Sequence, residues 1–306
     1  MYILETSGLT KVYNTNVALN NVDMHIEKGD IYGFVGENGA GKTTIIRIIS
    51  GLAKPTKGSY KLFGIENNNK EIETAKKKLG GIVESVSLNP TISAKKNLKI
   101  QSLVVGKKLT NEDFDDLLKR VGLNPLAIEN KNVGSFSLGM RQRLGIAMIL
   151  LSNPEFIILD EPMNGLDPKG FIEVRDIIKK LNEEGITFLI SSHILSELDK
   201  ICTRVGFISH GKMIKELSID ELHDQSKSKI IIEADNLEEL NNKLLEKLEI
   251  KNTKIKGKDL YIYDSIDIND VMKFLVEENI KIKNISRVEE ALENYYMKLI
   301  GGAKND

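Results

Sequence analysis

The sequence predicts an α/β fold for the first 220 of its 306 residues and a smaller α+β domain for the rest. Two observations carry the first prediction. The β-favouring run DIYGFV leads into the glycine-rich stretch GENGAGKTT and then into the helix-forming run IIRIIS. Further along, FIILD and ITFLIS are continuous apolar runs, typical of strands buried on both faces of a parallel sheet. From residue 221 onward, short segments alternate in the order β-α-β-β-α-β, the ferredoxin-like arrangement, with a final helix over 288–300.

The composition indicates a folded, soluble chain. Apolar residues make up 41% and charged residues 28%, and the 43 Lys and Arg nearly balance the 44 Asp and Glu. A net charge of -1 gives no electrostatic case for a nucleic-acid partner. We see no signal peptide and no run of about 20 apolar residues, so we expect a cytoplasmic protein without direct membrane insertion. The single cysteine, Cys202, lies in an apolar context that reads as helical, and we expect it to be a small buried hydrophobe.

The stretch GENGAGKTT predicts a phosphate-binding loop. Gly36, Gly39 and Gly41 allow the backbone to turn sharply with its N–H groups pointing inward, and the following helix N-terminus adds partial positive charge. Lys42 is then placed to reach the β- and γ-phosphates of a nucleotide, and Thr43 offers a hydroxyl to Mg²⁺. The alternative is a chance Gly-Lys-Thr turn.

The segments on either side of this loop predict further elements. Residues 2–13 and 18–30 read as strands of a small β-layer, 54–64 as a turn and strand, and 79–85 as another strand. Tyr13 lies in the β-layer, where its ring either stacks on a purine or simply packs. Glu84 falls at the carboxyl end of its strand, where ligands gather in open α/β sheets.

Residues 88–132 lose the strand and helix alternation and read as helical. We interpret 88–150 as an inserted helical subdomain. Its last helix opens at Gly139 and runs, increasingly apolar, to Leu151.

Two buried strands end in polar side chains that suit phosphate chemistry. The run FIILDEP ends in Asp160, which can hold Mg²⁺ through its water shell, and Glu161, which can orient or deprotonate a water for attack on a γ-phosphate. The alternative for this pair is a helix cap. An amphipathic helix over 171–184 follows, and then ITFLISSH ends in His193. His193 is either structural or a hydrogen-bond donor to a γ-phosphate oxygen.

These motifs, with SLGMRQRL and NGLDP in their order, make residues 1 to about 218 resemble the ATP-binding subunit of an ABC transporter. The resemblance implies a P-loop NTPase core with a flanking antiparallel β-layer and the inserted helical subdomain, an ATP-binding domain over 1–220 and an accessory domain over 221–306. Within that family the chain is similar to the bacitracin and lantibiotic type. The features that carry this likeness are IVES, SLGMRQRLGIAMILL, and DEPMNGLDP with ISSHILSELDKIC.

The resemblance implies ATP and Mg²⁺ as cofactors. Tyr13 resembles the aromatic residue that stacks on adenine, and Thr43 and Asp160 resemble the Mg²⁺ ligands. Glu161 is similar to the general base, and His193 to the histidine that senses the γ-phosphate. The phosphate-binding set carried over from the family is Gly36, Glu37, Asn38, Gly39, Ala40, Gly41, Lys42, Thr43 and Thr44.

Three residues match positions that face a second nucleotide domain. Ser137 and Gly139 resemble the signature serine and glycine, which in this family contact the ATP held by that second domain. Asp167 lies in the loop that crosses the dimer interface. The signature departs from the family pattern at Leu138 and Met140, and we still expect it to function.

The other departure is Glu84, which stands where most relatives have glutamine. As an acceptor-only side chain it would ligate the metal more tightly, yet it cannot donate to a water or a phosphate oxygen. We therefore expect Glu84 to take part in catalysis and metal binding, with a turnover that differs from the family norm.

The resemblance implies two partners. A second copy pairs head to tail around two ATP molecules, and a separate transmembrane permease holds the protein at the inner face of the cell membrane. We expect the chain to drive export or removal of a peptide antibiotic. The alternatives are the ATPase subunit of an exporter for another drug or a lipid, a soluble ABC ATPase acting on nucleic acid or the ribosome, and an interaction module whose C-terminal domain binds a regulator.

Overall fold

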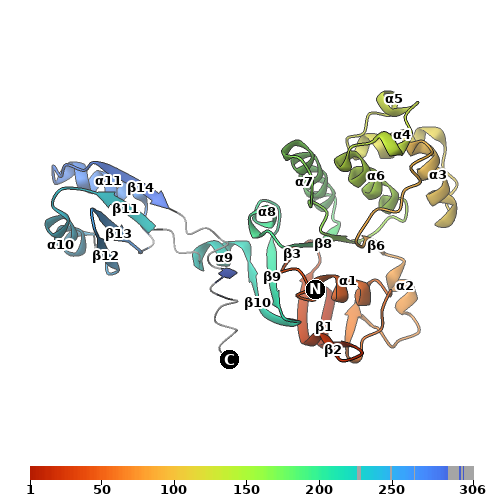
Figure 1. The fold of residues 1–306 in the computed structure, drawn as a ribbon, viewed down its shortest axis with the longest axis horizontal. Coiled ribbons are helices and arrows are strands. Elements are labelled where there is room, and N and C mark those ends of the chain that lie inside the picture. The colour runs from red at the N-terminus through yellow and green to blue at the C-terminus, as the bar shows by residue number, and fades with distance from the viewer. Residues whose placement is uncertain (226–228, 249, 265, 289–295, 298, 300–306) are drawn as a thin grey trace. The chain divides into compact units, whose positions relative to one another are not determined.

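The computed structural model describes residues 1–225, 229–248, 250–264, 266–288, 296–297 and 299 (Figure 1). The chain divides into two compact units, Met1–Ile219 and Asp220–Asp306. Each unit has its own core, and each is described by itself.

A six-stranded sheet forms the centre of the first unit, with the strand order β10-β9-β3-β8-β7-β6. Five of these strands are parallel, and β10 is antiparallel to β9 at one edge. The central strands β3, β7 and β8 are buried along their whole length, as their continuous apolar sequences predict. The bounds are β3 Ile31–Val35, β6 Leu79–Ile82, β7 Phe156–Asp160, β8 Thr187–Ser192, β9 Arg204–Ser209 and β10 Lys212–Ser218.

The N-terminal strands form a separate antiparallel layer, as predicted. Its order is β2-β1-β4-β5, with the bounds β1 Tyr2–Tyr13, β2 Asn16–Glu27, β4 Lys57–Leu62 and β5 Ile65–Glu66. Apolar side chains of this layer share one core with α1 and with the central sheet. The layer therefore holds a fixed position beside the glycine-rich loop.

Helices α3 to α6 lie together as the predicted helical subdomain (Figure 1). Side chains define several helix starts: Thr110 and Asp113 form a capping box before α4, Ser137 caps α6, and Asp167 caps α7. The helices of the first unit are α1 Lys42–Ile49, α2 Ile72–Lys76, α3 Ala94–Val104, α4 Asn111–Arg120, α5 Pro125–Ile128, the 3₁₀ turn Val133–Ser135, α6 Leu138–Leu150, α7 Pro168–Glu183 and α8 Leu195–Asp199; α9 Ile219–Gln225 begins at the division between the units.

The segment around Cys202 differs from the prediction. Cys202 is buried, as expected, but it lies outside any helix, between α8 and strand β9. Its local sequence reads as helical because apolar residues follow one another without alternation, a pattern that a fully buried strand also produces. The β9–β10 hairpin that follows was not predicted.

The second unit has the predicted ferredoxin-like order. Its antiparallel sheet runs β12-β13-β11-β14, and its core lies between this sheet and two helices. The elements are β11 Lys229–Glu233, α10 Leu237–Lys247, β12 Thr253–Lys256, β13 Asp259–Ile262, α11 Ile268–Glu277 and β14 Asn284–Val288. The final helix predicted over 288–300 falls largely outside the described residues. Among the described residues, no helix is long and apolar enough to cross a membrane.

Candidate functional site

The glycine-rich loop connects the end of β3 to the start of α1 and forms the floor of an open cleft of about 430 Å³. The cleft brings together parts of the chain that are far apart in sequence. It is lined by Tyr13, Asn16, Val17, Ala18, Asn38, Gly39, Gly41, Lys42, Thr43, Thr44, Glu161, His210 and Gly211.

Two glycines of this loop leave no room for a side chain. A Cβ on Gly36 would lie 2.6 Å from the carbonyl oxygen of Ile208, and one on Gly41 would lie 2.8 Å from that of Ala18. Gly41 also has a φ of 113°, which favours glycine strongly. Because Gly41 is the N-cap and has no side chain, the first N–H groups of α1 are left without a side-chain cap. A helix N-terminus in this condition is suited to bind an anion.

Lys42 is buried, and the protein itself satisfies its ammonium group. Its Nζ donates to the carbonyl oxygens of Gly36 at 2.6 Å and Glu37 at 3.2 Å, and lies 3.2 Å from Oε1 of Glu161. A lysine has three N–H donors, so these three contacts use all of them. A phosphate that binds Lys42 must therefore replace at least one of these partners.

Asp160 and Thr43 meet beside the loop. The Thr43 hydroxyl donates to Oδ2 of Asp160 at 3.0 Å, and the Ser191 hydroxyl donates to Oδ1 of Asp160 at 2.6 Å. Asp160 is buried, so these hydrogen bonds fix the carboxylate in one orientation. Ser191 is not among the residues predicted from the sequence; the signal available was the Ser-Ser pair before His193.

The oxygens of Asp160 and Thr43 fit Mg²⁺, which prefers hard oxygen ligands and keeps several waters. Among the described residues, no group of three His, Cys, Asp or Glu side chains could hold a metal ion. A metal at this position would therefore depend on hydroxyl, water and phosphate oxygens as well as on a carboxylate.

Glu161 and His193 contact each other where β7 and β8 end. Nδ1 of His193 lies 2.7 Å from Oε2 of Glu161, and the backbone N–H of Glu161 donates to the Ser191 hydroxyl at 2.8 Å. Because an ionised carboxylate only accepts hydrogen bonds, Nδ1 is the donor in this pair. Glu161 has a φ of 50°, which is uncommon for a residue with a side chain.

Tyr13 and His210 lie in the walls of the cleft. Tyr13 ends β1, its side chain is 40% exposed, and the Lys11 ammonium lies 4.7 Å from its ring centre. His210 lies in the turn between β9 and β10, which is held by hydrogen bonds from the Gly211 N–H to the Ala40 carbonyl and from the Asn20 N–H to the Gly211 carbonyl. His210 was not predicted as a site residue, because the hairpin that carries it into the cleft was not predicted.

Glu84 lies outside the set of residues that line the cleft. Its carboxylate forms an ion pair with Nη2 of Arg47, in the last turn of α1, and both side chains are more than 40% exposed. Glu84 has a φ of 65°. The structure thus places Glu84 near the far end of the helix that begins at the phosphate loop.

Ser137, Gly139 and Asp167 lie together at the N-terminal ends of α6 and α7. A Cβ on Gly139 would lie 3.4 Å from Cα of Gly170, whose N–H donates to Oδ1 of Asp167 at 2.9 Å. The Ser137 hydroxyl accepts from the N–H of Met140 at 3.2 Å. None of the three lines the cleft. The structure therefore presents a cleft and, separately, this signature surface.

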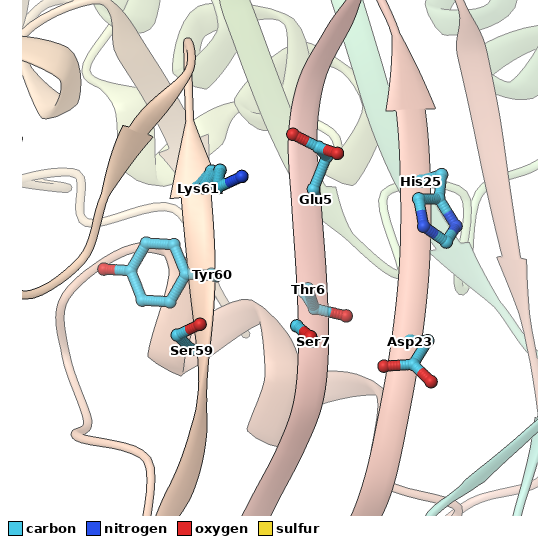
Figure 2. Close-up of a pocket in the computed structure, with 8 residues that line it drawn as sticks. All are labelled: Glu5, Thr6, Ser7, Asp23, His25, Ser59, Tyr60 and Lys61. Carbon is cyan, nitrogen blue, oxygen red and sulfur yellow. The ribbon is translucent and has the colours of Figure 1, made fainter.

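A second hollow, of about 370 Å³, lies on the antiparallel layer (Figure 2). Glu5 is directly opposite His25 on one neighbouring strand and Lys61 on the other, and Oδ1 of Asp23 accepts from the N–H of Gly8 at 2.7 Å. Glu5 and Asp23 therefore already have basic or hydrogen-bonding neighbours on the adjacent strands. This hollow has neither a glycine-rich loop nor a helix N-terminus in its lining.

Comparisons with known proteins show which family the chain resembles. Residues 19–164 match the family model described as ABC transporter. The bacitracin transport ATP-binding protein BcrA of Bacillus licheniformis is 38% identical over 98% of both chains. The lantibiotic transport ATP-binding protein SrtF of Streptococcus pyogenes is 41% identical over 79% of this chain and 98% of its own. Among solved structures, the dimeric post-hydrolysis ATP-binding cassette MJ0796 bound to ADP and Pi matches 71% of this chain and 98% of its own, with 26% identity and a TM-score of 0.63.

Proposed function

The chain belongs to the ABC transporter family, as the ATP-hydrolysing nucleotide-binding subunit of a transporter, and we propose that it drives the export or removal of a peptide antibiotic through a separate permease. The observation that carries the ATPase chemistry is that Lys42, Thr43 and Glu161 line one cleft. Asp160 contacts Thr43 there, and His193 contacts Glu161. The proposed substrate class rests on the two relatives that are named for bacitracin and lantibiotic transport.

ATP binding begins with an exchange of partners at Lys42. The triphosphate replaces Glu161 and the loop carbonyls as acceptors, while the uncapped N–H groups of α1 receive phosphate oxygens. Glu161 is then released from Lys42 but keeps its contact with His193. The free carboxylate orients a water and accepts its proton during attack on the γ-phosphate.

His193 holds Glu161 and reports on the γ-phosphate. Its Nδ1 lies 2.7 Å from Oε2 of Glu161, and its other ring nitrogen, Nε2, is the atom that would donate to a phosphate oxygen. One side chain would then contact both the carboxylate and the nucleotide. His193 can therefore make both of its contacts, to Glu161 and to the nucleotide, only while the γ-phosphate is present.

Mg²⁺, when bound, neutralises charge on the β- and γ-phosphate oxygens. Thr43 and Asp160 are the residues that would hold it. Ser191 keeps the Asp160 carboxylate in position through its hydrogen bond to Oδ1. Glu84 is proposed as a further ligand, which requires its ion pair with Arg47 to open.

Two copies are proposed to pair head to tail, because the cleft and the signature surface of Ser137, Gly139 and Asp167 are separate on one chain. In that pairing each signature surface meets the ATP of the other copy, with Tyr13 against the adenine. Permease contact through the helical subdomain places the protein at the inner face of the membrane. The dimeric state of the related cassette supports this arrangement.

Replacing Glu161 by Gln tests the ATPase reading. The amide cannot accept the water proton, so hydrolysis should fall by at least about 100-fold. The variant also loses the carboxylate that pairs with Lys42, so ATP should bind at least as tightly as before. Size-exclusion chromatography of Glu161→Gln with ATP should show a stable dimer, and a monomer at all ATP concentrations would overturn the proposed pairing.

Co-purification from native membranes through a tag on this chain tests the transporter partner. We expect a multispan permease in stoichiometric yield, and cells that lose bacitracin or lantibiotic resistance when Glu161→Gln replaces the wild type. Normal resistance with loss of another drug or lipid export activity would move the substrate to that class. Recovery of ribosomes or DNA without a membrane protein would instead support a soluble ABC ATPase.

A further inference from the structure

Lys11 does not line the nucleotide cleft, but it contacts a residue that does. Its ammonium lies over the ring of Tyr13, the last residue of β1, at 4.7 Å from the ring centre. Because side chains two residues apart on a strand point to the same side, Lys11 and Tyr13 share one face of β1. Lys11 is half-buried, whereas the Tyr13 side chain is 40% exposed and lines the cleft. One face of the Tyr13 ring is thus covered by a lysine of the same strand.

The Lys11 ammonium is also held from outside its own strand. Its Nζ donates to the carbonyl oxygen of Lys54 at 2.8 Å. The segment that carries this carbonyl is fastened to β1 by two hydrogen bonds. The Thr56 N–H donates to the Thr10 carbonyl at 2.8 Å, and the Val12 N–H donates to the Thr56 hydroxyl at 3.0 Å. The acceptor for Lys11 therefore keeps a fixed position relative to the strand.

A cation over one face of an aromatic ring changes what the ring can bind. The π electrons attract the ammonium, so a fixed ammonium favours one orientation of the ring. With Lys11 on one face, the opposite face of the Tyr13 ring is left for a flat ligand. The ammonium also draws π-electron density toward itself, which lessens the repulsion between the opposite face and the π electrons of a stacked base. Both effects favour stacking on the side away from Lys11.

We propose that Lys11 is a positioning residue for nucleotide binding, which holds the Tyr13 ring so that its opposite face stacks on the base. This role rests on the proposed contact between Tyr13 and adenine, and it adds the residue that orients that contact. The alternative is that Lys11 binds phosphate directly, as Lys42 does. The contacts favour the first role, because Lys42 lines the cleft whereas the Lys11 ammonium lies between the Lys54 carbonyl and the Tyr13 ring.

Calorimetric titration of the full chain with ADP and with pyrophosphate tests the proposal. Both ligands fit the phosphate loop and neither has a γ-phosphate, but only ADP carries a base. Lys11→Met keeps the length of the side chain and removes its charge. It should weaken ADP binding about two- to fivefold, because the cation–π contact is lost, and it should leave pyrophosphate binding unchanged. Lys11→Arg keeps a cation and N–H donors, so it should bind ADP like the wild type.

A double-mutant cycle shows whether Lys11 acts through Tyr13. Tyr13→Ala should itself weaken ADP binding about tenfold, because stacking on the base is lost. In the Tyr13→Ala background, Lys11→Met should then have no further effect on ADP binding. An equal loss in both backgrounds would overturn the proposal, because Lys11 would then act without the ring.

Lys61→Met is the matched control, because it makes the same charge change on the same antiparallel layer. Lys61 is exposed on β4 and lines the hollow of Figure 2 rather than the cleft. Its replacement should leave the binding of both ligands unchanged. If Lys61→Met and Lys11→Met weakened ADP binding equally, the effect would be one of overall charge and the proposal would be wrong. Weaker pyrophosphate binding by Lys11→Met would also overturn it, because Lys11 would then bind phosphate.

The same titrations separate this inference from the proposed function. If Tyr13→Ala bound ADP like the wild type, the adenine contact would be wrong, and the role of Lys11 with it. If Tyr13→Ala lost affinity but Lys11→Met did not, only the role of Lys11 would be overturned. None of these measurements involves a permease or a transported peptide, so the proposed transport function is decided by its own tests.

Discussion

The ion pair between Arg47 and Glu84 lies at the end of helix α1 that is far from the phosphate loop. It bears on whether Glu84 can bind a metal ion. Arg47 lies in the last turn of α1, and its ion pair holds the carboxylate of Glu84 outside the cleft. An exposed ion pair contributes about 0–1 kcal/mol, so it opens at little cost in stability. Glu84 can thus move without unfolding anything around it.

Replacing Arg47 by Ala should lower the Mg²⁺ concentration that the ATPase needs. With Glu84 released, the Mg²⁺ concentration that gives half-maximal activity should fall several-fold, and Mn²⁺ binding measured by electron paramagnetic resonance with a non-hydrolysable ATP analogue should tighten. The melting temperature should stay nearly constant.

Arg120→Ala is the control for this experiment, because Arg120 forms a comparably exposed ion pair with Glu184 in another part of the unit. An equal metal requirement in wild type, Arg47→Ala and Arg120→Ala would rule out Glu84 as a ligand.

At the residue scale, the sequence predicts those site residues that lie at a fixed spacing from a recognisable motif. Lys42 and Thr43 follow the loop directly, and Asp160 and Glu161 end a recognisable strand, so their meeting can be predicted. Ser191 and His210 could not be found in this way. Ser191 matters because its hydroxyl fixes Asp160, and His210 lies in the cleft because the N–H of its neighbour Gly211 donates to the Ala40 carbonyl. These are tertiary contacts, and no spacing along the chain marks them.

At the element scale, strand β10 joins the antiparallel layer to the central sheet through one carboxylate. Oε1 of Glu216 accepts from the Tyr32 hydroxyl at 2.6 Å and from the His25 N–H at 2.9 Å. Burial and the neighbouring Glu216 raise the pKa of Tyr32 well above its usual value, so the phenol stays protonated and remains a donor. Gly206 makes room for it, because a Cβ there would lie 1.9 Å from the hydroxyl.

Glu216→Ala should lower the free energy of unfolding by about 1–3 kcal/mol, because the buried Tyr32 hydroxyl then has no acceptor. In a Tyr32→Phe background the same change should cost less, since the donor is already gone. Urea unfolding of the four proteins in this double-mutant cycle gives the coupling. Equal costs in both backgrounds would show that Glu216 does not act through Tyr32.

The β9–β10 hairpin shows where element prediction fails. The sequence VGFIS has five buried residues in β9, so no alternation marks it as a strand. β10 alternates weakly because one face covers the antiparallel layer through Glu216, a polar residue, rather than through an apolar one. Strands β3, β7 and β8 are buried throughout as well, but each leads into a recognisable stretch of sequence: the glycine-rich loop after β3, Glu161 after β7 and His193 after β8.

At the scale of the whole molecule, the residues of the ATPase site all belong to the first unit, and the second unit is an accessory domain. The cleft, the signature surface and the helical subdomain all lie within Met1–Ile219, and the second unit has its own core. The β-α-β-β-α-β order of that unit was predictable because its short segments alternate clearly. The neighbours of each side chain across its sheet were not, because only strand register sets Glu233 and Lys256 on either side of Asp259.

Ending the chain at residue 219 should therefore leave a folded ATPase. A lantibiotic transport relative covers 79% of this chain with 98% of its own length, so a fifth of this chain has no counterpart in it. We expect near wild-type ATPase activity per cassette, because the cleft and the core around it lie within the first unit. An ATPase assay and a thermal melt of the truncated chain measure both properties. A truncated chain that is unfolded, or folded but inactive, would instead show that the second unit supports the fold or the chemistry of the first.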